Sequence, residues 1–240
     1  MYKTEFQSFI TNRNRNRLDK GRFFRTIVRF FVILPQKQKK MEHIKGTKEY
    51  ILYRAYEQYL LHGYHNVSIS ILQQELQIGR ASLYYYFKDK DSLFAAILNK
   101  FILSHIEAST HTPTTIGIND LIDCRVKCID AIANHIQQLH NPTLSIANVA
   151  SLMLSGITQL QDFMLQLKDL GQIQFNQWKT AIQNSINRGE IKADCDVTLT
   201  AYLFQHLKCG YEDPYCDLTN NVSDFYLKSC HHLLNLIRNK

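Results

Sequence analysis

Three consecutive tyrosines, Tyr84 to Tyr86, stand in the stretch SISILQQELQIGRASLYYYFKDKDSL. Successive helical residues are about 100° apart, so a helix cannot bury three adjacent rings and must expose at least one. A tyrosine combines an apolar ring with a hydroxyl that donates and accepts hydrogen bonds. Such a side chain can bind a partner through both its ring and its hydroxyl. The alternative is that one or two of them are core rings whose hydroxyls reach water.

Polar residues at predicted helix starts extend this candidate site. Arg80 and Ser82 precede the tyrosines, and an arginine can bond bidentately to guanine, which is worth about 1–3 kcal/mol of base discrimination. Ser68, a good N-cap, and Lys90 stand at helix N-termini, where free backbone N–H groups and the helix dipole attract a phosphate. The alternatives are a solvated arginine at position 80 and an ordinary exposed lysine at position 90.

Metal or catalytic chemistry has little support elsewhere in the sequence. The pairs with ligand-like spacing are Cys124 with Cys128, His206 with Cys209, and Cys230 beside His231 and His232. No second matching pair completes a tetrahedral zinc set. The favoured interpretation of the cysteines is reduced thiols in a cytosolic protein. Because no nucleophile–base set, phosphate loop or metal motif is present, we predict no enzymatic activity, cofactor or metal.

After residue 40 the apolar residues recur at helical spacing, without convincing strand alternation or an internal repeat. The sequence therefore predicts an all-α fold. The expected helices cover residues 46–64, 68–76, 80–87, 90–105, 119–139, 145–168, 175–188, 196–208 and 218–238. Gly63 and Gly189 are expected to end the helices before them, and Asp89 and Asp196 to cap the helices after them. Residues 111–120 are expected to form a loop.

Two short helices around a tight turn at residues 77–79 are typical of a helix-turn-helix. The run from Ile51 to Leu93 resembles the DNA-binding domain of TetR-family transcriptional regulators. The first part of the family pattern is matched by Ile51, Leu52, Ala55, Tyr59, Gly63 and Tyr64. The second part is matched by Ser68, Ile69, Leu72, Ile78, Leu83, Tyr84, Tyr86, Phe87, Lys90 and Leu93. The segment LYYYFKDKDSL is the most specific piece of this resemblance.

The resemblance implies a role for each face of the second short helix. Tyr84 and Tyr86 would send their hydroxyls to DNA phosphates, and Tyr85 would meet base edges or a thymine methyl. Leu83 and Phe87 would point inward and hold the helix on its support. The residues expected at the DNA are Ser68, Arg80, Ala81, Ser82, Tyr84, Tyr85, Tyr86 and Lys90.

Three residues depart from the family pattern. Gln73 replaces a small residue in the helix at 68–76. Gln77 replaces the turn glycine, although Gly79 follows two residues later, and Ala81 replaces the glycine that opens the recognition helix. We expect these changes to alter the angle between the helices or the base preference, and to leave the apolar framework intact.

Residues 186–210 also resemble TetR-type regulators, in which an R-G-E turn precedes an acidic cap and an amphipathic helix. The resemblance implies that this helix and the last one pack against their copies in a dimeric four-helix bundle. A two-fold dimer would place two recognition helices about 34 Å apart on a pseudo-palindrome. The candidate interface residues are Tyr202, Leu203, Phe225 and Leu234, for which the alternative is intrachain core.

By the same resemblance, helices between residues 104 and 190 would enclose a small-molecule pocket. The candidate lining residues are Met153, Phe163, Met164, Phe175 and Trp178. A Met or aromatic stripe is more often core than pocket, so the core alternative stays open. The implied mechanism is a population shift, in which an inducer of unidentified chemistry moves the recognition helices out of groove register.

The net charge of +7 is located in the N-terminal tail. Residues 1–40 hold eleven Lys/Arg and two Asp/Glu, whereas residues 41–240 hold seventeen and nineteen. We interpret the tail as disordered or not natively translated, since Met41 stands just before the first domain helix; a basic amphipathic helix for a membrane surface or the DNA backbone is the alternative. No segment approaches the ~18 uncharged apolar residues of a membrane span, so no stable membrane insertion is predicted.

The predicted organisation is a tail at 1–40, a helix-turn-helix domain at 44–104 with its motif at about 69–88, and a regulatory and dimerisation domain at 105–240. The leading hypothesis is a cytoplasmic, ligand-responsive repressor that binds double-stranded DNA as a homodimer. The alternative is a helical interaction protein whose helix-turn-helix no longer binds DNA specifically. Gln77 and the near-neutral balance of residues 41–100, seven basic and six acidic, favour this alternative.

Overall fold

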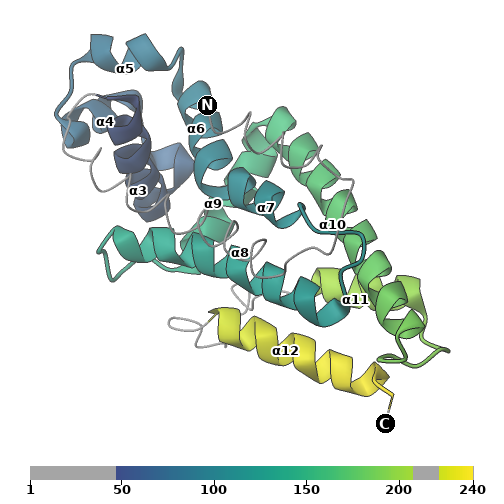
Figure 1. The fold of residues 1–240 in the computed structure, drawn as a ribbon. Coiled ribbons are helices and arrows are strands. Elements are labelled where there is room, and N and C mark those ends of the chain that lie inside the picture. Colours follow the sequence, from purple (N-terminus) through teal and green to yellow (C-terminus); the bar gives the residue numbers. More distant parts are fainter. Residues whose placement is uncertain (1–46, 208–221, 240) are drawn as a thin grey trace, which may run out of the picture. The chain divides into compact units, whose positions relative to one another are not determined.

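The computed structural model describes residues 47–207 and 222–239, which all belong to one compact unit, Ile44–Lys240. The regular elements of these residues are all helices, joined by turns and loops, with one isolated bridge between Ile191 and Arg238, so the predicted all-α class is confirmed (Figure 1). The elements are α3 (Lys48–Asn66), α4 (Ile69–Leu76), α5 (Arg80–Tyr86), α6 (Lys90–Leu98), η1 (Asn99–Leu103), α7 (Ser104–Ser109), α8 (Ile118–Gln138), α9 (Ile146–Gln159), α10 (Gln161–Asn187), α11 (Val197–His206) and α12 (Val222–Ile237). None of these described helices has both the length and the apolarity that crossing a bilayer requires. The tail predictions concern residues outside the described part.

Helix α3 is defined by one cap, one apolar face and one glycine. Thr47 Oγ1 accepts a hydrogen bond from Tyr50 N at 3.3 Å. The apolar face is buried and consists of Ile51, Leu52, Ala55, Tyr56, Tyr59 and Leu60. Gly63 interrupts the helix with φ 75° and ψ 161°, a region essentially restricted to glycine. Gly63 therefore breaks the helix where its end was predicted, although α3 resumes after the kink and ends at Asn66.

Helices α4 and α5 are joined by the predicted tight turn. Ser68 Oγ accepts a hydrogen bond from Ile71 N at 3.2 Å, which confirms Ser68 as the N-cap of α4. Gln77 adopts the left-handed conformation (φ 52°, ψ 44°), and its N–H donates to carbonyls at the end of α4. Glycine normally occupies such a C-terminal position. The turn therefore forms although glutamine replaces the family glycine here.

A continuous helix, here called the connecting helix (residues 90–109), follows α5 and comprises α6, η1 and α7. Asp89 Oδ1 accepts a hydrogen bond from Ser92 N at 2.7 Å, which confirms the predicted cap. The sequence predicted a regular helix ending near residue 105, whereas the structure has the π-helical segment η1 in the middle and ends at Ser109. A π turn holds more residues than an α turn, which allows three successive side chains to face the core. They are Phe101, Ile102 and Leu103.

Three predicted helix boundaries are wrong. Helix α8 starts at Ile118 rather than at residue 119 or 120, with Gly117 as its N-cap. The single helix expected over 145–168 is broken at Leu160, whose φ of −124° and ψ of 101° are extended. Helix α10 then runs through residues 169–174, where a gap between helices was expected.

Packing around Gly156 explains the break. A Cβ on this residue would lie 2.6 Å from Leu98 Cδ1 and 2.7 Å from Phe163 Cε1, so α6, α9 and the start of α10 approach each other where only glycine fits. Gly171 inside α10 costs about 1 kcal/mol relative to alanine. The packed face of a long helix outweighs that cost, because most helical stability in proteins comes from tertiary contacts.

The predicted start of α11 and end of α10 are both confirmed. Gly189 has φ 73° directly after α10. Asp196 Oδ1 accepts hydrogen bonds from Thr198 N and Leu199 N, both at 2.9 Å. The predicted ends at residues 208 and 218 lie outside the described residues.

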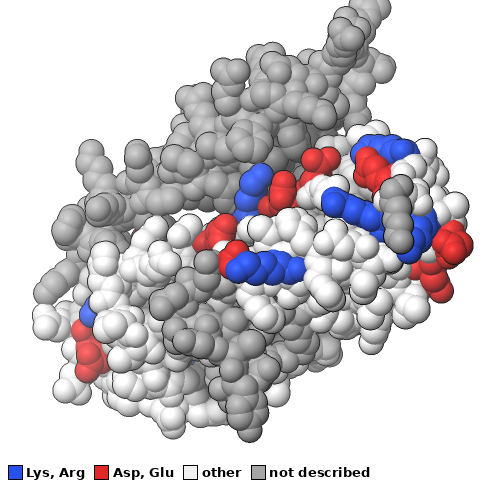
Figure 2. Space-filling model, turned by 90° about the horizontal axis from the view of Figure 1, so that it is seen from below, with Lys and Arg blue, Asp and Glu red and all other residues white. Residues whose placement is uncertain are grey.

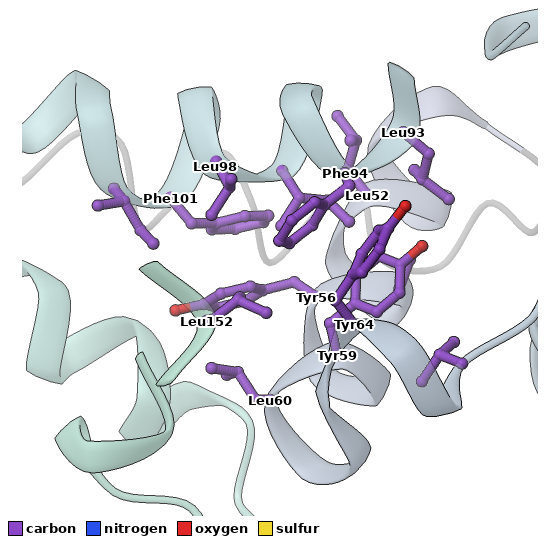
Figure 3. Packing of buried hydrophobic residues seen from close by; sticks show 14 of the residues in the cluster. Leu52, Tyr56, Tyr59, Leu60, Tyr64, Leu93, Phe94, Leu98, Phe101 and Leu152 are labelled. Atoms are coloured by element: carbon purple, nitrogen blue, oxygen red, sulfur yellow. The ribbon is translucent and has the colours of Figure 1, made fainter. Parts of the chain in front are cut away.

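Buried apolar side chains form two clusters. The first joins α3–α6 and η1 to the end of α8, to α9 and to Phe163 of α10; in it Tyr56 stacks on Phe101 with 4.2 Å between ring centroids (Figure 3). The second joins α8, α10, α11 and α12 around Trp178, which stacks on Phe204 at 4.9 Å. The predicted domain boundary at residues 104–105 falls inside the connecting helix, and the division into two domains stays a prediction.

Two histidines meet where the connecting helix packs on α8. The Nε2 atoms of His105 and His135 are 3.0 Å apart, and Phe101 meets the His135 ring edge-on at 5.7 Å. Burial lowers the pKa of His135 to about 4, helped by His105 and Lys100, and burial also lowers the pKa of His105. Both rings are therefore neutral at neutral pH, so one can donate a hydrogen bond to the other.

We expect the free energy of unfolding to decrease as the pH falls from 6.5, the ordinary pKa of histidine, towards about 4, the pKa of His135 in the folded chain. In this window the unfolded chain binds the proton and the folded chain does not, so acid favours unfolding. The contribution of His135 is present above the window and amounts to about 3 kcal/mol. Urea unfolding at a series of pH values measures it.

The variant His135→Phe should show a shallower pH dependence, because it removes the titrating ring. His232→Asn removes one histidine from the exposed side of α12 without touching the pair, and provides the control. Equal slopes for the wild type and His135→Phe would contradict the prediction.

Candidate nucleic-acid interface

Helix α5 is held by two side chains on its inner face. Leu83 and Phe87 are 0% and 4% exposed and belong to the first core cluster, as predicted. Lys48 Nζ lies 5.8 Å from the Phe87 ring centroid. In Figure 1, α5 lies at the edge of the α3–α6 group, away from α8 and α12. The two anchors fix which face of α5 meets solvent.

The outer face of α5 carries the three tyrosines. Tyr85 is 81% exposed, Tyr84 is 41% exposed and Tyr86 is 36% exposed, so the alternative that some of them are core rings is wrong. The Tyr85 and Tyr86 rings meet edge-to-face at 4.8 Å. A helix of seven residues thus presents three tyrosines to solvent, and one of their rings is largely exposed.

The start of α5 adds a cation to this surface. Arg80 and Ala81 are exposed and Ser82 is half-buried. The Arg80 guanidinium lies 5.4 Å from the Tyr84 ring centroid, a distance at which cation and ring attract each other. The structure therefore brings all six predicted residues of α5 onto one accessible surface.

The two flanking candidates differ in their surroundings. Ser68 is exposed, but its hydroxyl already caps α4. Lys90 Nζ lies 4.0 Å from the Tyr64 ring centroid, and burial lowers the pKa of Lys90. Hydrogen bonds from Ser92 to Asp89 lower the pKa of that carboxyl, which sits at the same helix N-terminus. The Lys90 ammonium is thus held over the Tyr64 ring, at the N-terminus of α6, which the Asp89 carboxylate already caps.

Bulk charge does not mark the segment that carries α5 as a nucleic-acid surface. Figure 2 shows the molecule from below, the side away from α5, and there Lys and Arg side chains lie beside Asp and Glu side chains rather than in a patch of one sign. Residues 41–100 carry seven basic and six acidic residues. Phosphate binding by α5 must therefore depend on the placement of individual donors.

The candidate pocket residues are divided between the two core clusters. Phe163 is buried and Met153 half-buried in the first cluster, whereas Trp178 is buried and Phe175 half-buried in the second. Met164 is half-buried on α10. The structure does not bring the five side chains into one group.

Three of the four candidate interface residues are exposed. Tyr202 and Leu203 on α11 and Phe225 on α12 are 54%, 44% and 40% exposed. Leu234 is 1% exposed, so its prediction as an interface residue is wrong. It continues the buried i, i+4 stripe of α12, which comprises Val222, Tyr226, Cys230 and Leu234.

Sequence analysis missed two exposed leucines on the same helices. Leu199 on α11 and Leu236 on α12 are 56% and 60% exposed. The signal for Leu199 was available, because it lies one helical turn before Leu203.

The cysteines show no sign of a metal or reactive site in the described ranges. Cys124, Cys128, Cys195 and Cys230 are free. Burial raises the pKa of Cys128 and of Cys230 to about 11, so both are protonated thiols at neutral pH. Among residues 47–207 and 222–239, no three His, Cys, Asp or Glu side chains gather to hold an ion. Cys209 lies outside these ranges.

A short outward-facing helix, supported after a tight turn by α3 and α4, defines a helix-turn-helix protein. Residues 51–97 match the family model described as bacterial regulatory proteins, tetR family. The match covers 47 of the 240 residues and shows a TetR-type DNA-binding domain in that part of the chain.

Solved structures support the fold at low sequence identity. KstR2, a ketosteroid transcriptional regulator of Mycobacterium tuberculosis, has a TM-score of 0.57 at 17% identity, over 79% of this chain and 94% of that one. PfmR from Thermus thermophilus, a TetR-family regulator, has a TM-score of 0.53 at 16% identity, and the match covers 77% of this chain and 97% of PfmR. SmeT bound to triclosan has a TM-score of 0.56 at 14% identity, and the match covers 79% of this chain and 90% of SmeT. SmeT is the repressor of the Stenotrophomonas maltophilia multidrug efflux pump SmeDEF. No curated protein sequence matches the chain.

Proposed function

We propose that the chain is a ligand-responsive repressor that binds a pseudo-palindromic operator as a homodimer. The observation that carries the proposal is the outer face of α5, where Tyr85 is 81% exposed on a helix fixed by buried Leu83 and Phe87. A helix of this length, about 10 Å, fits a major groove about 12 Å wide. The described part of the protomer leaves most of the Tyr85 ring uncovered, so the ring can meet a base.

The residues of the interface have two kinds of role. Arg80 and Tyr85 contact base edges and set sequence preference. Ala81 and Ser82 lie between the backbone of α5 and the bases. The hydroxyls of Tyr84 and Tyr86 bind phosphates and fix the register. Ser68 and Lys90 add phosphate contacts from the flanking helices.

The exposed apolar residues of α11 and α12 support the homodimer. Tyr202, Leu203 and Phe225, with Leu199 and Leu236, leave large apolar side chains in solvent on two C-terminal helices. A second copy would bury them across a two-fold axis and place two α5 helices on successive major grooves. We further propose that this dimer acts in the cytoplasm, where it meets DNA.

The connecting helix supports the ligand response. It starts shortly after α5, and its last residue, Ser109, accepts hydrogen bonds from Arg125 of α8 and Gln174 of α10, so a ligand bound among the regulatory helices of residues 105–240 can move the domain of residues 44–104 through it. A ligand that binds one arrangement of this helix better than another shifts the population away from the DNA-binding state.

Binding of the full-length protein to labelled DNA from upstream of its own gene tests the proposal. Arg80→Ala and Tyr85→Ala should each weaken specific binding about 10-fold or more, because each removes a base contact worth about 1–3 kcal/mol. Tyr84→Phe with Tyr86→Phe should weaken binding to specific and unrelated DNA alike. Fluorescence anisotropy at several salt concentrations measures both effects.

Leu154→Ala is the matched control, since Leu154 is 60% exposed on α9, outside the interface. A folded dimer that gives no specific complex would overturn the proposal and favour the helical interaction protein.

A further inference from the structure

A buried arginine in α8 lacks a carboxylate partner in the described part of the chain. Arg125 is only 7% exposed. Among the described residues, no Asp or Glu forms an ion pair with it. Taking a charge out of water costs several kcal/mol unless an opposite charge or several hydrogen bonds compensate it. The guanidinium of Arg125 is buried and its described partners are all neutral, so it can still bind an anion.

The hydrogen bonds of Arg125 are incomplete. Nη1 donates to the backbone oxygen of Ser109 at 2.7 Å and to Ser109 Oγ at 3.0 Å. Nη2 donates to Gln177 Oε1 at 2.7 Å. Nε is buried without a partner among the described residues. The edge formed by Nε and Nη2, which can hold a carboxylate with two parallel hydrogen bonds, thus has a single neutral amide oxygen on it.

The Trp178 ring lies near the guanidinium of Arg125. The guanidinium carbon lies 5.8 Å from the centroid of the Trp178 ring, which stacks in turn on Phe204. Phe175 lies one turn before Trp178 on α10, and Lys179 Nζ is 5.9 Å from its ring centroid. A positive charge among rings suits a ligand that combines an acid group with an apolar body.

Arg125 also holds the end of the connecting helix. Ser109 is the last residue of α7, and its carbonyl is one of the terminal acceptors that the helix itself leaves unpaired. The other end of the connecting helix follows α5. A change in the partners of Arg125 therefore acts on the element that carries the recognition helix.

We propose that Arg125 anchors the effector of this regulator, and that the effector is a small organic carboxylate with an apolar, ring-bearing body. The proposal rests on the ligand response proposed above and names its chemistry. The carboxylate takes Nε and Nη2 in place of Gln177 Oε1, and the body packs against Trp178. The guanidinium then turns away from Ser109, which frees the end of the connecting helix and shifts α5.

Sequence analysis did not single out Arg125. The signal was present, because this arginine interrupts the apolar stripe of α8 between Ile122 and Cys128. An arginine on an inner face is rarely buried unless it is paired.

Trp178 is the only tryptophan in the chain, so its fluorescence reports on this site in the full-length protein. We expect 4-phenylbutyrate to quench it saturably and to bind roughly 10- to 100-fold more tightly than 4-phenylbutyramide, which has the same body without the charge. Inorganic phosphate, an anion without an apolar body, should not compete. Equal affinity for the acid and the amide would overturn the proposal, and so would equal competition by phosphate.

Three variants assign the effect to Arg125. Arg125→Met should abolish the preference for the acid, and Arg125→Lys, which keeps the charge without the two-pronged edge, should reduce it. Arg188→Met is the matched control, because Arg188 is exposed and donates to the backbone oxygen of Thr115 in the loop before α8. If Arg125→Met does not fold by circular dichroism, Arg125→Lys decides. An unchanged preference in the folded Arg125 variants would overturn the proposal.

A DNA-binding arm separates this inference from the proposed function. In the wild type, 4-phenylbutyrate should weaken operator binding several-fold; in Arg125→Lys it should do so less, and in Arg125→Met not at all. A protein that binds no DNA but shows the Arg125-dependent preference contradicts the proposed function and supports the anchor. A protein that binds its operator and responds equally to the acid and the amide contradicts the anchor alone.

Discussion

Replacing Phe101 with alanine is expected to lower the free energy of unfolding by about 3–5 kcal/mol, the usual cost of removing a fully buried ring. Phe101 is 0% exposed and lies in η1. Its ring stacks on Tyr56 of α3 at 4.2 Å with 6° between the planes, and meets Tyr53 and His135 edge-on at 6.3 and 5.7 Å. One side chain thus joins α3, the connecting helix and α8; Figure 3 shows Phe101 beside Tyr56.

The loss in stability is large because the neighbouring side chains cannot collapse into the space that the Phe101 ring leaves. Its ring partners belong to two other helices, α3 and α8, and a cavity remains unless both move. Natural domains have only about 5–15 kcal/mol of stability in total. Phe101→Ala should therefore also reduce the folded, DNA-binding population at physiological temperature.

Urea unfolding followed by circular dichroism measures the effect. Phe101→Leu is the control, because it keeps much of the apolar volume and should lose clearly less. A loss below about 1 kcal/mol for Phe101→Ala would be typical of a surface position and would contradict the packing described for η1.

Two glycine-to-alanine substitutions are expected to change stability in opposite directions. Gly63→Ala should lower the free energy of unfolding by about 2 kcal/mol, because φ 75° and ψ 161° lie in a region that alanine enters only under strain. Gly171→Ala should raise it by about 0.5–1 kcal/mol, because alanine favours the helical conformation that Gly171 already has in α10. At both positions an added Cβ meets no atom within 4 Å. The sign is therefore set by the backbone alone.

The expected consequence of the Gly63 strain is local as well as global. Gly63 directs Tyr64 back onto the start of the connecting helix, where the Tyr64 hydroxyl donates to Asp91 and the ring lies under Lys90. Gly63→Ala should loosen this junction and weaken DNA binding, while Gly171→Ala should not. Thermal and urea unfolding of the two variants side by side provide the measurement. Destabilisation by both, or by neither, would contradict the backbone argument.

The helix-turn-helix could be predicted because its signals are local. Ser68 and Asp89 cap helices that begin one residue later, and Gly63 occupies a conformation that almost excludes other residues. Leu83 on α5 and Phe87, the extended residue that follows it, are four positions apart and both buried, which leaves the tyrosines outside. These decisions depend on residues within a few positions of each other, which a sequence displays directly.

Even here, two local signals were ambiguous. Position 77 holds glutamine where the family pattern has glycine. Only the structure shows that this glutamine adopts φ 52° and preserves the turn. Lys90 matches the family lysine, but its position over the Tyr64 ring depends on a residue at the far end of α3.

The sequence by itself thus determined the class of fold, the caps of the short helices and the outward face of α5, since period and capping chemistry are properties of neighbouring residues. Tertiary structure decided the break at Leu160, which follows from Gly156 meeting Leu98 and Phe163. It also decided that Leu234 is core and that Arg125 is buried without a carboxylate from the described residues. Burial depends on partners that are distant in the chain, and no local pattern states which distant residues will meet.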